Sequence, residues 1–451
     1  MTRDDYKIAY IENLIEMNKS EEIARFLSDF HPADIAALID NLEKEEKRGV
    51  FSSLTVETAS EVIVKVDETS RRQILRRLSS DKLTEIVDEM ETDDAADIIG
   101  ELSDDRATSI LEEIGQEESK EVQKLLLYGK ETAGGIMQTE LVSVKDCVDV
   151  EYAINHIRSF GERVEDFHNV FVTNEENKLT GILPLRKLIL ATANAKISDI
   201  MTVDPVIVDV NVDQEEVAKL IQKYDLVSIP VIDTSGTLLG RITIDDVVDV
   251  MEEETSEDFM KMAGMGEVEE LVYGPKVFKI SQKRLPWLLI NLAGGLFTGY
   301  LMWFFKVTIE NALTLVTFIP VITGMGGNVG IQASSIVVRG MAIGRIELAH
   351  IRSVLFKEVR IGAIMGFACG GVVGLVAPFW HGTVVLGLIV GFAMFTAITV
   401  AAMMGTLIPA LFKKMNIDPA IASGPFVTTA NDITGILIYF SIATMSLKYI
   451  V

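Results

Sequence analysis

The sequence predicts a multidomain membrane protein with an N-terminal α-solenoid-like helical domain, a tandem pair of α+β domains, a long connecting helix and a five-helix transmembrane domain. Three observations predict this fold class: a 12-residue repeat near the N-terminus, a strand–turn–strand–helix pattern that occurs twice, and five long apolar segments after residue 284. We expect the helical domain at 1–130, the α+β pair at 131–250, the connecting helix at 245–280 and the transmembrane domain at 281–451.

Charge is distributed very unevenly along the 451 residues. From Lys283 to the C-terminus there are 11 basic and 5 acidic residues, whereas the first 282 residues hold 30 basic and 61 acidic residues, a net charge of −31. A soluble half with this charge repels nucleic acid and anionic lipid, and it attracts divalent cations. For any single acidic run, simple solvation of a surface is the alternative explanation.

Residues that support enzyme or metal-cluster chemistry are sparse. The two cysteines, Cys147 and Cys369, lie in different halves, so neither a disulfide framework nor a zinc cluster is expected. The five histidines lack metal-type spacing, and neither a hydrolase triad nor an ATP-hydrolysis motif is present. We therefore expect neither an enzyme nor an active pump. The polar N-terminus also predicts no cleavable signal peptide.

An internal repeat covers residues 30–114. Its apolar residues recur every 12 positions, at Phe30, Leu42, Leu54, Val66, Leu78, Met90, Leu102 and Ile114. Most of them precede a residue that favours a helix N-cap, such as Thr55, Asp67, Ser79 or Ser103, and then a helical apolar pattern. A helix of about eight residues cannot bury its apolar face alone, so we expect the repeats to stack as a small α-solenoid.

Two copies of an α+β unit follow the repeat. Buried strands are predicted at 168–173 and 227–232, each preceded by a helix and followed by a turn, a second strand and another helix. With Asp199-Ile-Met-Thr202 between the copies and Gly240-Arg-Ile-Thr-Ile-Asp-Asp246 in the second, the region resembles a tandem pair of cystathionine-β-synthase (CBS) domains. Such pairs are usually regulatory, and many bind adenine nucleotides such as ATP. The sequence leaves open whether this pair does.

The second copy continues into an unusually acidic helix, expected from Asp245 onward. Acids at positions 245, 246, 249, 252, 253, 254, 257 and 258 run beside an apolar stripe of Val247, Val248 and Met251. Closely spaced like charges destabilise a helix, so a counter-charge such as a bound cation is one explanation. A solvated linker helix is the other.

Each of the five apolar segments is long enough to cross a bilayer, for which a helix needs about 20 residues. They lie roughly at 285–305, 312–338, 358–379, 384–411 and 421–446. Lys and Arg gather before the first segment and in the connections after the second and the fourth. This bias predicts a cytosolic N-terminus and an external C-terminus. We expect a multi-pass protein of the cell (plasma or inner) membrane.

Asp432 is the acid that the sequence places well inside an apolar span. A charge at this depth costs at least a few kcal/mol and persists where it faces water, a partner or an ion. Its neighbours carry oxygens of the kind that hard cations favour: Thr428, Thr429 and Asn431. Gly424 and Pro425 interrupt the helical pattern and are expected to expose backbone carbonyls. We interpret this stretch as an ion site, the alternative being a buried acid tied to backbone or to a neighbouring helix.

A glycine-rich stretch, Gly324-Met-Gly-Gly-Asn-Val-Gly330, falls within the second span. It is no phosphate loop, because no Lys-Ser or Lys-Thr follows and it lies at membrane depth. Two interpretations stay open. The glycines allow close helix packing, or they form a wall of the pathway in which Asn328 is a polar contact.

The order of these elements and three motifs resemble the MgtE family of magnesium channels and transporters over essentially the whole chain. The motifs are Ala133-Gly-Gly-Ile-Met137, Gly326-Gly-Asn328 and the stretch from Pro425 to Gly435. The resemblance implies a homodimer in the lipid bilayer with the pore on its axis, and a connecting helix that acts as a plug. It also implies an ion site formed by Asp432 of both subunits, to which we add Thr428, Gly424 and Asn328 from the pattern of this chain.

One departure from the family pattern concerns this ion site. Family members can carry Asn where this chain has Gly424, and a small apolar residue where it has Thr428. The first shell of the ion is therefore expected to rely on backbone, water and Thr428.

The resemblance further implies regulatory Mg²⁺ sites in the cytosolic half. The matching acids come from the helical domain, the second CBS copy, the connecting helix and the turn before the fifth span: Asp93, Asp97, Glu215, Glu216, Asp225, Asp246, Asp249, Glu254, Glu257, Asp258 and Asp418.

The predicted function is passive import of Mg²⁺ down its electrochemical gradient, with closure when Mg²⁺ bridges Asp93 and Asp97 to the acids of the connecting helix and CBS pair. One alternative is a broader importer of Co²⁺, Ni²⁺ or Mn²⁺, although softer metals would favour His or Cys. The other is a membrane-anchored CBS nucleotide sensor without transport, which would have no need of Asp432. No nucleic-acid partner is expected.

Overall fold

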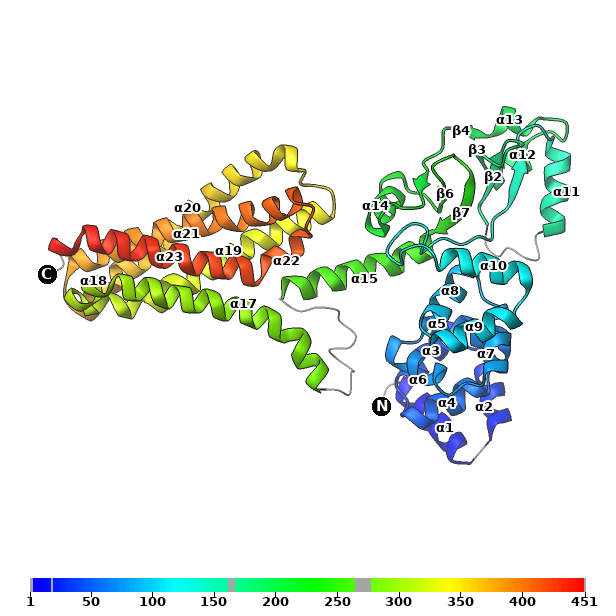
Figure 1. Cartoon of the computed structure of the whole chain (residues 1–451), viewed down its shortest axis with the longest axis horizontal. Coiled ribbons are helices and arrows are strands. Elements are labelled where there is room, and N and C mark those ends of the chain that lie inside the picture. The colour runs from blue at the N-terminus through cyan, green and yellow to red at the C-terminus, as the bar shows by residue number, and fades with distance from the viewer. Residues whose placement is uncertain (1–2, 18, 161–166, 264–276, 450–451) are drawn as a thin grey trace. The chain divides into compact units, whose positions relative to one another are not determined.

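The structure is a computed structural model that describes residues 3–17, 19–160, 167–263 and 277–449. The chain forms two compact units, Met1–Glu252 and Glu253–Val451. The first contains a helical domain and two α+β domains, and the second contains the long apolar helices (Figure 1).

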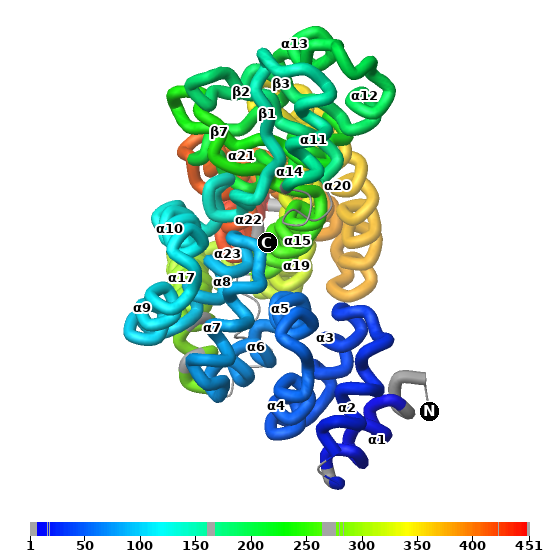
Figure 2. The backbone as a smooth tube through the Cα atoms, turned by 90° about the vertical axis from the view of Figure 1, so that its right-hand side faces the viewer, coloured from blue at the N-terminus to red at the C-terminus, as the bar shows by residue number. Residues whose placement is uncertain are grey.

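Short helices build the N-terminal part of the first unit. They are α1 (Arg3–Glu16), α2 (Ser20–Leu27), α3 (Pro32–Asp40), α4 (Lys44–Ser52), α5 (Val56–Lys65), α6 (Glu68–Leu75), α7 (Ser80–Asp88), α8 (Thr92–Gly100), α9 (Asp104–Glu113) and α10 (Gln116–Leu125). From α3 to α10 each helix begins 12 residues after the one before it, which confirms the predicted repeat. Alternate helices pack on one another, α3 on α5, α5 on α7 and α7 on α9, and form the stack seen in Figure 2.

Local capping explains why the short helices start where they do. The side chain of Thr55 accepts a hydrogen bond from Thr58 N at 3.2 Å, and Asp67 accepts one from Ser70 N at 2.7 Å. Such caps satisfy amide donors that have no partner within the helix. Ser79 caps α7 in the same way, whereas Ser103, which the sequence also suggested as a cap, makes no such hydrogen bond. The repeated apolar positions lie in or against one continuous core.

Two small sheets with flanking helices follow, as the twofold pattern predicts. The first copy contains β1 (Ser143–Lys145), α11 (Val150–Phe160), β2 (Asn169–Thr173), β3 (Leu179–Pro184), α12 (Leu185–Leu190), α13 (Ile197–Ile200) and β4 (Thr202–Val203). The second contains β5 (Val208–Asp209), α14 (Gln214–Tyr224), β6 (Ser228–Ile232), β7 (Leu238–Thr243) and α15 (Ile244–Met262). In both, a parallel pair (β1–β2, β5–β6) adjoins an antiparallel pair (β2–β3, β6–β7).

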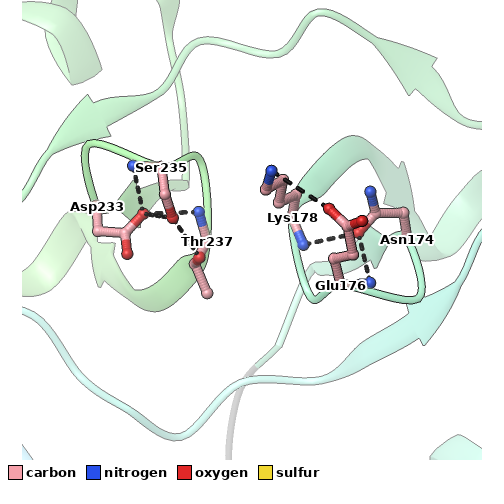
Figure 3. A network of polar contacts seen from close by, with 6 residues as sticks. All are labelled: Asn174, Glu176, Lys178, Asp233, Ser235 and Thr237. Carbon is pink, nitrogen blue, oxygen red and sulfur yellow. Dashed lines mark hydrogen bonds and ion pairs between the residues drawn. The ribbon is translucent and has the colours of Figure 1, made fainter.

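The two copies meet through their equivalent turns (Figure 3). Asn174 Oδ1 accepts the amides of Glu176 and Lys178 in one turn, and Asp233 Oδ1 accepts those of Ser235 and Thr237 in the other. The turns also pair through backbone, since Leu179 N donates to Gly236 O and Leu238 N donates to Asn177 O, both at 3.1 Å. Because Leu179 corresponds to Leu238 and Asn177 to Gly236, these two hydrogen bonds are equivalent, as expected for a pair of related domains.

The Ala133–Met137 motif pairs with the second copy, although it precedes the first in sequence. Ala133 N donates to Val212 O at 2.7 Å and Gly134 N donates to Val210 O at 2.8 Å. A side chain at Gly135 would overlap the carbonyl oxygen of Gly129. Glycine is therefore required by close backbone approach at this position.

The second unit contains five helices that meet the length and composition of membrane spans within the described residues, in agreement with the sequence. These spans are Ile280–Phe304, Leu313–Ala342, Leu348–His381, Val384–Lys414 and Pro419–Met445. They are built from α17 (Val277–Phe304), η1 (Leu313–Phe318), α19 (Ile319–Ala342), η2 (Leu348–His350), α20 (Ile351–His381), α21 (Val384–Lys414), α22 (Pro419–Ser423) and α23 (Pro425–Met445), with α18 (Lys306–Asn311) between the first two and η3 (Leu447–Tyr449) at the end.

α21 is the central helix of this unit, because it packs against α19, α20 and α23. Small residues permit the closest approaches. A side chain at Gly366 on α20 would lie 2.7 Å from the carbonyl oxygen of Phe395, and one at Gly405 on α21 would overlap that of Gly330. Helix association in membranes depends on such backbone proximity. Of the two interpretations of the glycine stretch, packing is therefore correct for Gly330.

Two boundaries differ from those predicted. The third long helix begins at Ile351, so Glu358 lies inside it and is only 5% exposed, whereas the sequence placed this acid at the edge of a span. The connecting helix was expected to reach residue 280. α15 ends at Met262, residues 264–276 lie outside the described part of the chain, and α17 begins at Val277.

Candidate ion pathway and regulatory acidic cluster

The fifth span is broken between α22 and α23, as the Gly-Pro pair predicts. Asp418 caps α22 by accepting a hydrogen bond from Ala420 N at 2.8 Å, and Gly424 separates the two helices with φ −82° and ψ −103°. The expectation of an exposed Gly424 carbonyl is not met. Thr428 donates to it from both its amide, at 3.1 Å, and its hydroxyl, at 3.0 Å. What Thr428 presents to an ion is its hydroxyl lone pairs.

Asp432 lies within α23, one turn after Thr428, and is partly exposed. Its carboxylate makes no hydrogen bond or ion pair with the described residues, although an ionised group in an apolar span is costly. The alternative of an acid tied to a neighbouring helix therefore has no support among these residues. Asn328 on α19 is exposed in the single chain.

Two neighbours of Asp432 serve helix packing. Asn431 is 2% exposed, its Nδ2 lies 3.4 Å from Gly326 O, and its Oδ1 has no hydrogen-bond partner. Thr429 faces α17, where its Oγ1 lies 3.4 Å from Asn291 Oδ1. Both side chains thus lie at helix contacts, and the expectation that they supply ion oxygens stays a prediction.

A second site lies in the first unit, where an acidic cluster is formed by Glu91, Asp93, Asp94, Glu140 and Asp246. Asp93 is 8% exposed, and its Oδ1 has no hydrogen-bond partner. Burial first, and then the negative charge of Asp246, raise the pKa of Asp93 well above its ordinary value. A buried carboxyl in which one oxygen has no hydrogen-bond partner carries a large desolvation cost when ionised.

The neighbouring acids of the cluster share this environment. Burial and repulsion from Glu140 raise the pKa of Glu91 to about 7. Burial and repulsion from Asp246 raise the pKa of Asp94 to about 7. Burial raises the pKa of Asp246 to about 6, even though its hydrogen bonds with Thr243 oppose this rise. A positive charge placed among these carboxylates would reduce the repulsion that each of them experiences.

The segment after α10 holds the cluster together. Thr92 N donates to Glu140 Oε1 at 3.1 Å, and Gln138 Nε2 donates to Glu91 Oε2 at 2.8 Å. The start of α8 is thereby fixed to the chain that enters the CBS pair. Asp246 at the start of α15 faces the same acids, so the helical repeat and the second CBS copy meet here.

The other predicted regulatory acids are not all brought together. Asp97 and Asp249 are exposed beside the cluster. Glu215 and Glu216 lie in the first turn of α14, whereas Asp225 caps its other end, about 14–15 Å away. Glu215 is instead paired with Lys219 at 2.8 Å.

Along the second part of α15, Glu257 is paired with Lys261, which also contacts Asp418. Glu254 and Asp258 lie on the same helix. Among the residues that the structure describes, no three His, Cys, Asp or Glu side chains are close enough to bind one metal ion directly. Mg²⁺ retains several of its waters, so a cluster of separated carboxylates, in which Asp93 Oδ1 has no hydrogen-bond partner, still suits it as a partly hydrated ion.

Sequence reasoning missed three members of the cluster. Glu91 and Asp94 adjoin predicted residues, and the run Glu91-Thr-Asp-Asp94 at a helix start was the available signal. Glu140 had no local signal, because only the tertiary hydrogen bonds with Thr92 bring it to α8.

Comparisons with known proteins agree with this architecture. Models of three families match the chain: "Divalent cation transporter" at residues 319–442, "MgtE intracellular N domain" at 30–131 and "CBS domain" at 197–253. The magnesium transporter MgtE of Enterococcus faecalis is 39% identical over 335 residues, 74% of this chain and 73% of that protein. That of Bacillus subtilis is 36% identical over 327 residues, 72% of each.

Among solved structures, the cytosolic domain of the Mg²⁺ channel MgtE in complex with ATP matches with a TM-score of 0.51 and 30% identity, over 54% of this chain and 99% of that one. The fold, the candidate spans and these matches define a multi-pass membrane transporter that carries a CBS pair. The chain belongs to the MgtE family of magnesium transporters. This is a family of transporters and not of enzymes.

Proposed function

We propose that the protein is a passive Mg²⁺ channel in which Asp432 is the central ion-binding group of the pore. The observation that carries this proposal is the unpartnered carboxylate of Asp432 within an apolar span of a magnesium-transporter chain. An acid in such a place is retained when it faces water or an ion. With the membrane potential negative inside, a divalent cation then enters the cell without any input of ATP.

The ion is expected to pass largely hydrated. Mg²⁺ sheds its waters reluctantly and keeps several when it binds a protein. Thr428 contributes hydroxyl lone pairs and Asn328 contributes an amide oxygen, whereas Gly424 positions Thr428 through its carbonyl. Because the Gly424 carbonyl is already bonded to Thr428, contacts through water suit this site better than direct coordination.

A homodimer would complete the pathway. Asp432 and Asn328 are accessible on the single chain, where they would otherwise contact lipid. Polar groups at membrane depth occur where protein or a water-filled cavity covers them. Two copies facing each other would place two Asp432 carboxylates around one ion, with the doubled negative charge favouring a divalent over a monovalent cation.

Closure is proposed to follow from Mg²⁺ binding to the soluble half. The Lys and Arg bias places this half in the cytosol, with the C-terminus outside. Mg²⁺ near Asp93, Asp97, Asp246 and Asp249 would relieve the repulsion within the acidic cluster and favour the conformation that holds α8 and α15 together. A transported ion that prefers the closed state in this way also inhibits its own entry.

We also propose the CBS pair as the place where an adenine nucleotide binds. Support comes from the related cytosolic domain that was solved in complex with ATP. Calorimetric titration of the full-length protein with ATP tests this directly, and absence of binding at millimolar ATP would contradict it.

Flux measurements in proteoliposomes test the pore assignment. Mg²⁺ entry would be compared for the wild type, Asp432→Asn and the control Glu310→Gln, an acid of α18 outside the long span helices. We expect flux in the wild type and the control, and none or unselective flux in Asp432→Asn. Equal flux of Co²⁺, Ni²⁺ or Mn²⁺ would favour a broader importer. Absence of any flux in the wild type would favour a membrane-anchored nucleotide sensor.

A further inference from the structure

Three charged side chains meet where α15 approaches the turn before the fifth span. Lys261 Nζ lies 2.6 Å from Glu257 Oε1 and 2.7 Å from Asp418 Oδ2. Glu257 and Lys261 are one turn apart on α15, so the helix itself places them side by side. Asp418 comes from the chain between α21 and α22, 157 residues further along the sequence.

Both oxygens of the Asp418 carboxylate are engaged. Oδ1 accepts the amide of Ala420 and caps α22, whereas Oδ2 accepts the ammonium of Lys261. The side chains of Lys261 and Asp418 are 23% and 31% exposed, so solvent screens the contact only in part. Burial by itself would lower the pKa of Lys261, but hydrogen bonds from its ammonium to Asp418 and Glu257 raise it. The ammonium is charged at neutral pH.

The family resemblance includes both Glu257 and Asp418 among the acids of the regulatory Mg²⁺ sites, but at this contact the two residues do not fit a divalent ion. A bound Mg²⁺ requires oxygens at about 2.0–2.1 Å in octahedral geometry. Here the oxygens that face each other both contact a single ammonium, which occupies the position a cation would need. A lysine is a compact cation with three donors and already neutralises one of the two negative charges.

We propose that Lys261 is a built-in cation that holds the second half of α15 to the transmembrane domain without Mg²⁺. This inference deepens the proposed gating, since it leaves the Mg²⁺ response to the acids of the first unit. The contact between α15 and Asp418 then persists at any Mg²⁺ concentration. What varies with Mg²⁺ is the repulsion among the acids of the first unit, which acts against this contact.

Hydrogen exchange of residues 253–262 in the full-length protein in detergent tests this without relying on transport. Lys261→Met keeps a long, unbranched side chain and the helix propensity but removes the charge, whereas Lys261→Arg keeps the charge. In Mg²⁺-free buffer we expect protection in the wild type and in Lys261→Arg. We expect about fivefold faster exchange in Lys261→Met, as for loss of a partly exposed ion pair.

A second charge-removing variant identifies the partner. Asp418→Asn keeps the cap of α22 and removes the charge that Lys261 contacts. It should speed exchange of residues 253–262 as Lys261→Met does, and the double variant should be no faster than either single one. Because Lys261→Met frees two carboxylates, millimolar Mg²⁺ should restore its protection but not that of the double variant.

Two results would overturn the inference. One is wild-type exchange that is fast without Mg²⁺ and slowed by Mg²⁺, which would place a metal ion at this contact. The other is a Lys261→Met variant with wild-type exchange. If the exchange pattern is found while the wild type shows no flux, the role of Lys261 stands and the proposed channel function fails.

Discussion

The backbone of Gly330 on α19 lies directly against the carboxamide of Asn431 on α23, so that any side chain at position 330 would overlap the amide nitrogen of Asn431. Asn431 is buried and immediately precedes Asp432. This contact therefore sets how α23 lies on α19 beside the proposed ion site. On its other side, Gly330 contributes the carbonyl against which Gly405 of α21 packs.

Gly330→Ala is expected to impair both stability and transport. The added methyl would have to displace Asn431 and Val427, and overpacking of a dense core costs about 1–3 kcal/mol. Gly371→Ala on α20 is a matched control, because its added methyl meets nothing within 4 Å and the gain in helix propensity is the same. Thermal unfolding in detergent and Mg²⁺ flux are the measurements. Equal behaviour of the two variants would contradict a tight Gly330–Asn431 contact.

Asp93→Asn is expected to make closure of the pathway less dependent on Mg²⁺. The substitution keeps the shape but removes a buried charge whose Oδ1 has no hydrogen-bond partner. Without Mg²⁺ the first unit should become more stable, so closure of the pathway should require less Mg²⁺, by about tenfold in concentration, equivalent to about 1.4 kcal/mol.

Asp105→Asn, on the exposed start of α9, controls for the general loss of one negative charge. Flux is measured as a function of Mg²⁺ on the cytosolic face. An unchanged closing concentration in Asp93→Asn would remove this residue from the regulatory mechanism.

The acidic cluster also predicts a pH dependence. The pKa values of Glu91 and Asp94 are about 7 and that of Asp246 about 6, all above those of the unfolded chain. Between about pH 4 and pH 7 the folded state therefore binds more protons than the unfolded state, so stability falls as the pH rises through this range. Without Mg²⁺, α8 should exchange faster at pH 8 than at pH 6.

Hydrogen exchange of α8 in the full-length protein, corrected for intrinsic rates and repeated with Mg²⁺, measures this effect. Added Mg²⁺ should slow exchange more at pH 8 than at pH 6, because proton and cation relieve the same repulsion. Slower exchange at pH 8 than at pH 6 in the absence of Mg²⁺ would contradict the raised pKa values.

Local patterns were enough to predict most of the fold. The 12-residue repeat anticipated helix starts from Pro32 to Gln116, because each short helix carries its own apolar stripe and, at Thr55 and Asp67, its own cap. The two CBS copies and the five candidate spans likewise follow from period and length. Asp432 was identified because an acid within an apolar segment is visible in sequence alone.

Contacts between distant segments were beyond such patterns. No local pattern shows that the backbone of Gln138 pairs with that of Arg241 in the second copy. Nor does one show that Asn431 packs against Gly330 of α19 while its neighbour Asp432 does not. The hydroxyl of Thr428 similarly occupies the Gly424 carbonyl that the helix break was expected to free. Lys261 was overlooked because its meaning depends on Asp418, which only the fold brings to it.

The central claim is that the ion carried through the membrane also closes the pathway from the cytosolic side. Mg²⁺ flux into proteoliposomes containing the wild-type protein, measured while Mg²⁺ on the cytosolic face is varied, tests this most directly. Flux that is present at low Mg²⁺ and falls as cytosolic-face Mg²⁺ rises, beyond the loss of the gradient itself, is the expected result. Flux that depends only on the gradient would contradict regulation by the acidic soluble half.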